Sequence, residues 1–279
     1  SIGGASYPAN GDSEVRLLAH ADTAMARAKE TGKSRCVIYS KEKFNLPEHD
    51  VLMEAAMFNG VRNGEFSLQY QPIVEASSRK IMGFEALMRW SRLSLGSVSP
   101  AQFIPMAEGN GLINLLGAWA LKVACVQLKR FEEVAGRPLY VSVNVSPRQF
   151  RNSQFLARVD EAISLSGLKG NQLLLEITEG VLMSDPEHAE ELLTAISARN
   201  VRIAIDDFGT GYSSLNYISK FPLHAIKIDK QYVRDYKDNE FNRTLMFTLL
   251  SIANVLDCLL VAEGVDEYET LEFLKNNLI

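Results

Sequence analysis

The chain has 279 residues, 47% of them hydrophobic, which is enough to bury one large domain, or one large and one partial domain. Its formal net charge of −5 argues against a nucleic-acid polymer as a partner. No apolar run reaches the length of a membrane span, and no signal peptide begins the chain. The three scattered cysteines indicate reduced thiols, so we expect a cytoplasmic location, with any inner-membrane anchor in regions outside this chain.

The first 40 residues predict a strand, a loop, an amphipathic helix over about 14–30 and a short strand at 36–39. The polar segment 41–50, with its one proline, is typical of a linker. Both ends of the chain are abrupt, so we expect a longer polypeptide to surround it.

From residue 51 onward, short apolar segments alternate with helical patterns. The helices are predicted near residues 50–62, 114–134, 153–166, 186–199, 240–256 and 266–276. The strands are predicted at residues 68–74, 83–89, 140–146, 173–178, 201–206, 225–229 and 259–263. This alternation predicts βαβ units and a parallel sheet, close to a TIM-like (β/α)8 barrel of the α/β class. The eighth strand would follow residues 275–279, where the sequence stops.

Each predicted strand carries a polar residue on the same side, near its C-terminal end. These residues are Gln71, Glu85, Asn144, Glu176, Asp206, Lys227 with Asp229, and Glu263. Because strand faces alternate with period two, parallel strands would gather these groups at one mouth of the barrel. Carboxylate and amide oxygens are ligands of Mg²⁺ or Mn²⁺, and the Asp206-Asp207 pair would let one carboxylate bridge two ions. The pattern therefore predicts a site for two divalent metals, whereas any one of these acids alone more often forms a helix cap or a salt bridge.

The motifs around these residues resemble, in order, those of EAL domains, a family of bacterial cyclic-di-GMP phosphodiesterases. They are Tyr70-Gln71-Pro72-Ile73, Glu85-Ala86-Leu87, Asn144-Val145-Ser146-Pro147, Leu175-Glu176-Ile177-Thr178-Glu179, Asp206-Asp207-Phe208-Gly209, Lys227-Ile228-Asp229 and Ala262-Glu263-Gly264-Val265. The resemblance implies hydrolysis of cyclic-di-GMP to linear pGpG, support by Mg²⁺ or Mn²⁺, inhibition by Ca²⁺ and a homodimer. Two alternatives stay open, a receptor that binds cyclic-di-GMP without cleaving it and a dimerising signalling scaffold.

The resemblance also implies roles for individual residues. The first metal would be held by Glu85, Asn144, Glu176 and Asp206, and the second by Asp206, Asp207 and Glu263. Lys227, whose pKa nearby metals would lower, either accepts a proton from the attacking water or holds that water. Asp229 either steers Lys227 or a metal-bound water, or caps the helix that follows it.

Three further residues complete the expected site. Gln71 and Arg89 resemble substrate contacts, although Arg89 could instead be a structural ion-pair partner. Glu179 resembles the carboxylate that braces the glycine-bearing loop 207–214, although it could also favour a first helical turn.

The stretches 1–5, 21–25 and 28–33 resemble the last part of a GGDEF diguanylate cyclase domain, whose signature is absent from this sequence. We therefore expect a cyclase remnant at 1–40 that makes no cyclic-di-GMP, a linker at 41–50 and an EAL domain at 51–279. A last family motif containing Gln-Gly-Tyr is also absent. An open barrel edge is costly, so we expect residues 1–279 alone to be poorly stable or inactive.

Overall fold

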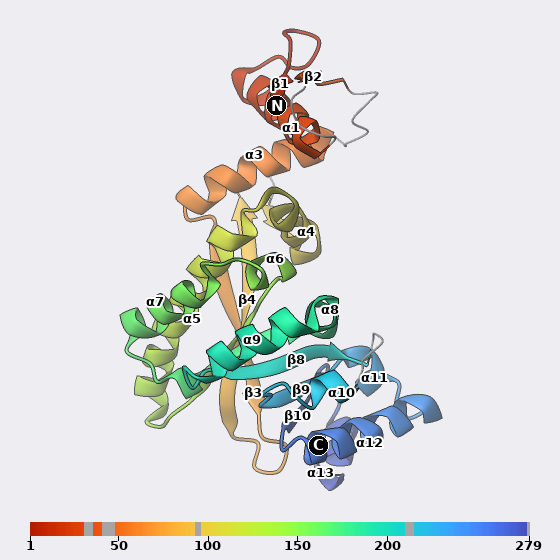
Figure 1. The fold of residues 1–279 in the computed structure, drawn as a ribbon. Coiled ribbons are helices and arrows are strands. Elements are labelled where there is room, and N and C mark those ends of the chain that lie inside the picture. Colours follow the sequence, from red (N-terminus) through yellow and green to blue (C-terminus); the bar gives the residue numbers. More distant parts are fainter. Residues whose placement is uncertain (31–35, 41–47, 93–95, 210–214, 278–279) are drawn as a thin grey trace. The chain divides into compact units, whose positions relative to one another are not determined.

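A computed structural model describes residues 1–30, 36–40, 48–92, 96–209 and 215–277 (Figure 1). Residues 31–35 of the expected cyclase remnant, 41–47 of the expected linker, 210–214 of the glycine-bearing loop and 278–279 at the end lie outside the described residues. The chain forms two compact units. The first contains Ser1–Ser67 and Arg89–Leu112, and the second contains Leu68–Met88 and Ile113–Ile279.

The first unit begins with the strand, helix and strand that the sequence predicts. They are β1 (Ile2–Gly4), α1 (Glu14–Glu30) and β2 (Cys36–Ile38), and the two strands pair in parallel. A Cβ atom on Gly3 would lie 2.0 Å from the carbonyl oxygen of Ala21, so only glycine allows β1 to lie this close to α1. The first unit also contains α3 (Glu48–Arg62), β5 (Gly96–Val98) and α4 (Pro100–Asn110).

The sheet that carries the predicted site runs through the second unit. Its strands are β3 (Phe66–Val74), β4 (Ile81–Arg92), β6 (Tyr140–Asn144), β7 (Leu173–Thr178), β8 (Arg202–Phe208), β9 (Ala225–Ile228) and β10 (Leu259–Ala262). Their order is β10-β9-β8-β7-β6-β4-β3, with β5 antiparallel to β4 at the far end of that strand. The neighbouring strands β4–β6, β6–β7, β7–β8, β8–β9 and β9–β10 are connected through helices, and each of these pairs is parallel, as predicted.

The expected ring of parallel strands is only partly correct, because the sheet is mixed and strongly curled into a half-barrel. Strand β3 is joined to its neighbour β4 by residues 75–80, a connection too short for a parallel crossover, so the two strands run antiparallel. No pairing joins β3 to β10 within the described part of the chain.

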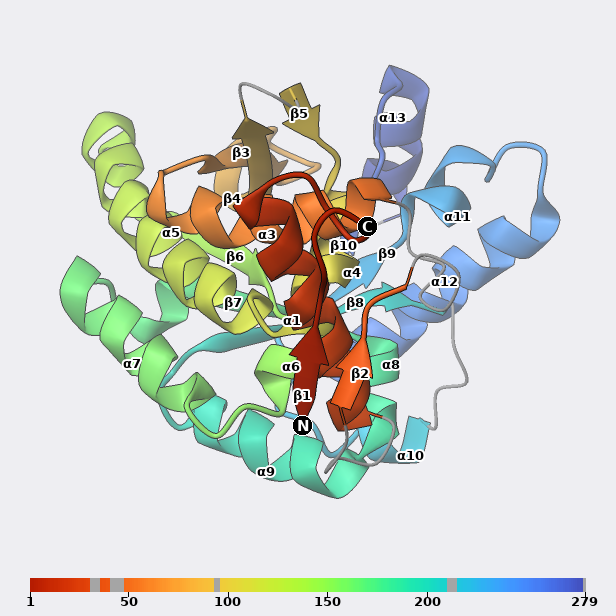
Figure 2. The same cartoon turned by 90° about the horizontal axis from the view of Figure 1, so that it is seen from above.

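The long helices of the second unit surround its strands (Figure 2). They are α5 (Ile113–Ala135), α7 (Phe155–Ser166), α9 (Pro186–Ser197), α12 (Glu240–Val255) and α13 (Tyr268–Asn276). Each was predicted from its apolar periodicity. Helices α4, α6 (Pro147–Phe150) and α10 (Leu215–Ile218) were not predicted from the sequence, and α8 (Glu179–Ser184) and α11 (Lys230–Arg234) were anticipated only as alternatives for Glu179 and Asp229. All but α4 are too short to show a helical period.

Successive residues of each strand point alternately outward, toward the helices, and inward, toward the concave face of the sheet. The outward side chains of the central strands are buried against the helices; among them are Leu175, Ile177, Ile205, Ile226 and Ile228. On the inward side Leu174, Ala204 and Ala225 form a separate apolar cluster with Tyr140 and Val261. The polar residues of the site lie on the same inward side, further along the same strands.

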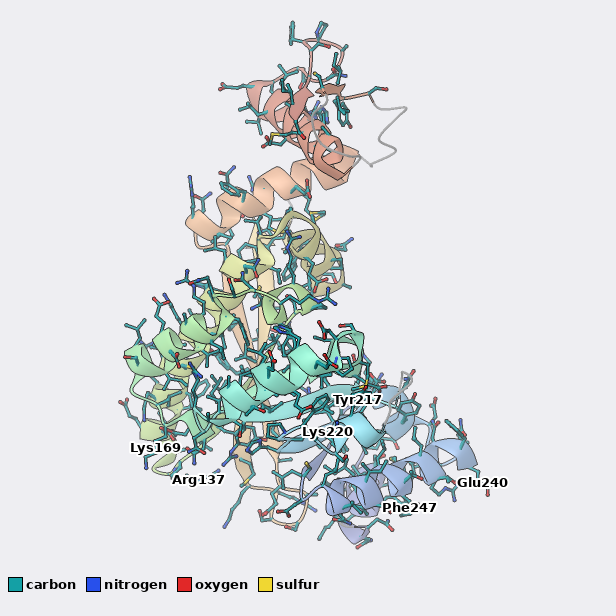
Figure 3. The ribbon with its side chains drawn as sticks, in the orientation of Figure 1. Arg137, Lys169, Tyr217, Lys220, Glu240 and Phe247 are labelled. Atoms are coloured by element: carbon teal, nitrogen blue, oxygen red, sulfur yellow. The ribbon has the colours of Figure 1, made fainter. Side chains whose placement is uncertain are left out.

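Helix α12 keeps part of its apolar surface exposed. Figure 3 marks Glu240 in its first turn and Phe247 near its middle. Phe247 packs edge-on against Phe273 of α13, with 6.1 Å between the ring centroids, yet 39% of it stays exposed.

Among the described residues no single helix is long and apolar enough to cross a membrane, and only the bent pair α4 and α5, taken together, has the length and composition that a span would need.

Candidate active site

Lys227 is the centre around which the predicted metal ligands converge. It lies in β9, is only 2% exposed, and has the same inward phase as predicted. Its Nζ lies 2.7 Å from Glu176 Oε2, 2.7 Å from Glu263 Oε1, 3.3 Å from Asp206 Oδ1 and 3.5 Å from Glu85 Oε2. The structure therefore brings carboxylates from four different strands or strand ends to a single cation on a fifth strand.

Strand register delivers these side chains to one place. Asn144 of β6 lies opposite Glu176 of β7, and Thr178 of β7 lies opposite Asp206 of β8. Asn144 Nδ2 donates a hydrogen bond to Glu85 Oε1 over 2.8 Å, which leaves the amide oxygen of Asn144 available as a ligand. Glu85 and Gln71 are exceptions to the expected placement at strand ends, because β4 continues past Glu85 to Arg92 and β3 continues past Gln71 to Val74.

The electrostatics of the cluster show an excess of negative charge. Burial lowers the pKa of Lys227, but the surrounding carboxylates outweigh burial and hold that pKa above its ordinary value. Burial, together with the neighbouring carboxylates Glu85 and Asp206, raises the pKa of Glu176 in spite of the Lys227 ammonium. Burial and then the charge of Asp206 raise the pKa of Asp207 to about 6. One ammonium thus leaves part of the negative charge uncompensated.

The donor set fits a hard divalent cation. Glu176 Oε1 is buried and has no hydrogen-bond partner among the described residues, although a buried carboxylate oxygen requires a donor, a water or a cation. Oxygen ligands at this density are what Mg²⁺ and Mn²⁺ bind. Within the described part of the chain no three acidic, histidine or cysteine side chains are already arranged around an ion position, since the carboxylates point at Lys227. Holding a metal therefore requires some of them to turn from the ammonium.

The backbone after Asp206 has an unusual conformation. The pairing of β8 with β9 is irregular between Ile205 and Phe208. Asp207 has a φ of 53°, in the left-handed region, and its N–H donates to Asp206 Oδ1 over 3.0 Å. Such a conformation in a non-glycine residue is strained and is common at functional sites.

Two polar side chains hold the segment that follows. Glu179 Oε2 accepts a hydrogen bond from the Gly209 N–H over 3.1 Å, so this residue contacts the start of the loop that it is expected to brace. Glu179 is also the first residue of α8, so its two proposed placements coincide. The Tyr232 hydroxyl donates to the Gly209 carbonyl oxygen over 3.1 Å. Sequence analysis missed Tyr232, because one tyrosine in a five-residue helix carries no recognisable signal.

Asp229 caps helix α11, which is one of the two roles that the sequence predicts for this residue. Its Oδ1 accepts a hydrogen bond from the Gln231 N–H over 2.7 Å at the start of α11. A hydrogen bond and the charge of Asp229 also contribute to the raised pKa of Asp207. Asp229 therefore lies at the edge of the carboxylate cluster as well as at a helix terminus.

The two expected substrate contacts lie on the first two strands of the sheet. Gln71 is an exposed residue of β3 in the second unit. Arg89 follows Glu85 by four residues in β4 and therefore has the same strand phase, but it belongs to the first unit. A role for either residue in substrate binding stays a prediction.

Comparison with known proteins agrees with the geometry. The EAL domain family matches residues 54–278, so the chain belongs to the EAL domain family. It is 34% identical over 275 residues to the bifunctional diguanylate cyclase/cyclic di-GMP phosphodiesterase MucR of Pseudomonas aeruginosa, covering 98% of this chain and 40% of MucR. It is 31% identical over 277 residues to the cyclic di-GMP phosphodiesterase NbdA of the same organism, covering 99% of this chain and 35% of NbdA.

Solved structures show the same fold. A structure described as PaMucR phosphodiesterase in complex with c-di-GMP superposes with a TM-score of 0.76 at 33% identity, covering 79% of this chain and 90% of that one. The curled half-barrel is therefore the fold of EAL domain structures. The chain spans less than half the length of the two curated relatives.

Proposed function

We propose that this chain is a metal-dependent phosphodiesterase that hydrolyses one phosphodiester bond of cyclic-di-GMP to give linear pGpG. The observation that supports this most directly is the convergence of Glu85, Glu176, Asp206 and Glu263 within 3.5 Å of Lys227 Nζ. Membership of the EAL family supports the same substrate, as do the names of MucR and NbdA, both of which include cyclic di-GMP phosphodiesterase.

Two hard divalent cations, when bound, would polarise the scissile phosphate and lower the pKa of the attacking water. We assign the first to Glu85, Asn144, Glu176 and Asp206, and the second to Asp206, Asp207 and Glu263. Mg²⁺ and Mn²⁺ should support activity, and Ca²⁺ should inhibit it because its looser coordination misplaces the reacting groups.

Lys227 has one of two roles in the reaction. The attacking water forms a bond to phosphorus, one P–O bond to the ribose breaks, and a proton passes to the leaving oxygen. Lys227 either takes the proton that the water loses or holds the water by a hydrogen bond, and only the neutral amine can do the first. In the protein alone the carboxylates favour the ammonium form, so the base role requires positive charge to be added nearby. Gln71 and Arg89 are proposed to contact the nucleotide, with the guanidinium suited to a phosphate oxygen.

The test is release of pGpG from cyclic-di-GMP with Mn²⁺, followed by chromatography. Glu85→Gln keeps the size of the side chain and removes its charge. Loss of a residue that only orients a metal ligand typically lowers activity by about 10- to 100-fold, so loss of a ligand itself should lower turnover by about 100-fold or more. The control Glu187→Gln changes an exposed glutamate in the first turn of α9 and should keep full activity. Equal turnover in Glu85→Gln and the unsubstituted chain would refute the site assignment.

The main alternative is a receptor that binds cyclic-di-GMP without cleaving it. Binding of the intact dinucleotide with no pGpG released in Mg²⁺ or Mn²⁺ would favour this alternative. If neither binding nor hydrolysis were seen, the result would instead favour a dimerising signalling scaffold.

We also propose that residues 1–40 derive from the C-terminal part of a GGDEF domain, that 41–50 form a linker and that 51–279 form the EAL domain. The EAL match begins at residue 54, whereas the similarity to MucR, whose name includes a diguanylate cyclase, covers 98% of the chain. A homodimer is part of the same proposal, and sedimentation of the purified chain tests it.

A further inference from the structure

The peptide group of Gly209 is held from both sides. Its N–H donates to Glu179 Oε2 over 3.1 Å, and its carbonyl oxygen accepts from the Tyr232 hydroxyl over 3.1 Å. The φ of Gly209 is 94°, a value that favours glycine. The Tyr232 ring also packs close by, since a Cβ atom on Gly209 would lie 3.9 Å from it.

This clamped peptide lies two residues after Asp207, which is itself in the left-handed region. A strained residue keeps its conformation only if the structure on both sides fixes the backbone. On the upstream side the pairing of β8 with β7 fixes Asp206. On the downstream side Phe208 pairs with Ile228 of β9, and Gly209 is held by Glu179 and Tyr232. The direction in which Asp207 presents its carboxylate therefore depends on the pairing of Phe208 and on how firmly Gly209 is held.

Tyr232 is well placed to fix that peptide. It lies in α11, which begins immediately after Asp229, and its own N–H donates to the Asp229 carbonyl oxygen over 3.0 Å. Helix α11 is tied in turn to α12, because Asn242 Nδ2 donates to the Gln231 carbonyl oxygen over 3.3 Å. The hydroxyl thus connects the end of β8 to the segment that follows Lys227.

We propose that Tyr232 is a positioning residue for the second metal: its hydroxyl holds the Gly209 carbonyl and, with Glu179, fixes the backbone that presents Asp207. The inference rests on the proposed function, since it assigns Asp207 to a metal. It gives the chain a second anchor for this segment, in addition to the Glu179 carboxylate.

Tyr232→Phe tests the proposal, because it keeps the ring and removes only the hydroxyl. We expect Mn²⁺ binding, measured by calorimetry without nucleotide, to weaken by about two- to tenfold, the change that one neutral hydrogen bond is worth. The backbone amides of residues 206–209 should exchange hydrogen for deuterium faster, while those of β6 should not change. Tyr236→Phe is the control, since Tyr236 stacks on Phe273 and its hydroxyl makes no hydrogen bond to the described residues.

A purely structural role predicts a different result. In that case Tyr232→Phe would lower the melting temperature but leave Mn²⁺ affinity and exchange at 206–209 as in the unsubstituted chain, and the proposal would be overturned. Combining Tyr232→Phe with Glu179→Gln should give a loss of affinity that differs from the product of the two single losses, because both act on one peptide.

The outcomes separate this inference from the proposed function. If the unsubstituted chain binds Mn²⁺ without releasing pGpG, and Tyr232→Phe weakens that binding, the phosphodiesterase proposal fails and the positioning role stands. If the chain releases pGpG and Tyr232→Phe binds Mn²⁺ normally, only the positioning role fails. No Mn²⁺ binding by the unsubstituted chain overturns both.

Discussion

Lys227 Nζ lies 2.7 Å from Glu176 Oε2, and the two residues are 2% and 1% exposed. Taking two opposite charges out of water is costly, and the pair is tolerated because each satisfies the other. Since further carboxylates also face the ammonium, Lys227 holds the site together in the protein without metal. The same ammonium occupies the point at which the carboxylates would otherwise repel one another.

Replacing Lys227 with methionine should therefore destabilise the metal-free protein. Breaking a buried ion pair by removing one partner costs about 3–5 kcal/mol, because the other charge stays buried. Metal ions would supply the missing positive charge, so Mn²⁺ should restore much of the lost stability while hydrolysis stays absent. Thermal unfolding of Lys227→Met in EDTA and in Mn²⁺ measures both effects.

The control for this variant is Lys237→Met. Lys237 pairs with Glu267 over 2.8 Å and with Glu269 over 2.7 Å, but these groups are on the surface. We expect little change in unfolding, and the same response to Mn²⁺ as in the unsubstituted chain. Similar melting temperatures for Lys227→Met and the unsubstituted chain in EDTA would show that Lys227 does not hold the cluster together.

Asp229 allows its capping role to be separated from a role in the reaction. Asparagine caps helices as well as aspartate does, whereas alanine cannot accept the hydrogen bond from the Gln231 N–H. Asp229→Asn should thus keep the stability of the unsubstituted chain, and Asp229→Ala should lose about 1 kcal/mol. If the charge also steers Lys227 or the water, both variants lose activity. Full hydrolysis by Asp229→Asn would leave capping as the only role.

Gly83 is needed for the pairing that positions Glu85. A Cβ atom on Gly83 would lie 2.5 Å from the carbonyl oxygen of Tyr140, its partner across β4 and β6. Gly83→Ala must shift the strands apart, which should lower the free energy of unfolding by about 1–3 kcal/mol. It should also reduce activity, because Glu85 lies two residues after Gly83 in β4 and would be displaced. Chemical denaturation measures the loss.

Gly109→Ala is the matched substitution in open space. A Cβ atom there meets no atom within 4 Å, and alanine favours a helix interior over glycine. We expect unchanged or slightly higher stability. An equal loss in the two alanine variants would mean that contact with Tyr140 is not the cause.

His224 should make stability fall as the pH falls. Burial, and then the charge of Arg202, lower the pKa of His224 in the folded protein. Its Nδ1 accepts a hydrogen bond from the Ile203 N–H over 3.3 Å, which only the neutral ring can do. Because the unfolded chain takes up the proton first, this contribution is complete above the ordinary histidine pKa of about 6.5 and is lost as the pH drops below it.

His224→Asn isolates that contribution, since its amide oxygen can accept the same bond without titrating. Denaturation at pH 7 and pH 5 should show a smaller loss of stability on acidification for the variant than for the unsubstituted chain. Identical losses would exclude His224 as the source of the dependence.

The sequence by itself determined the elements and the direction in which the site residues point. The apolar periods of α5 and α12 locate those helices, and the alternation in Lys227-Ile228-Asp229 turns Lys227 inward, because both signals depend only on near neighbours in the chain. The order of the EAL motifs likewise identified the family.

Only the tertiary structure decided which atoms meet. It made β3 antiparallel, placed the Lys227 ammonium among the carboxylates, and brought the Tyr232 hydroxyl to the Gly209 carbonyl. These contacts join residues far apart in the sequence, through strand register and short helices that leave no periodic signal. The physical reason is that local propensity sets the conformation of each segment, whereas packing between segments sets their partners.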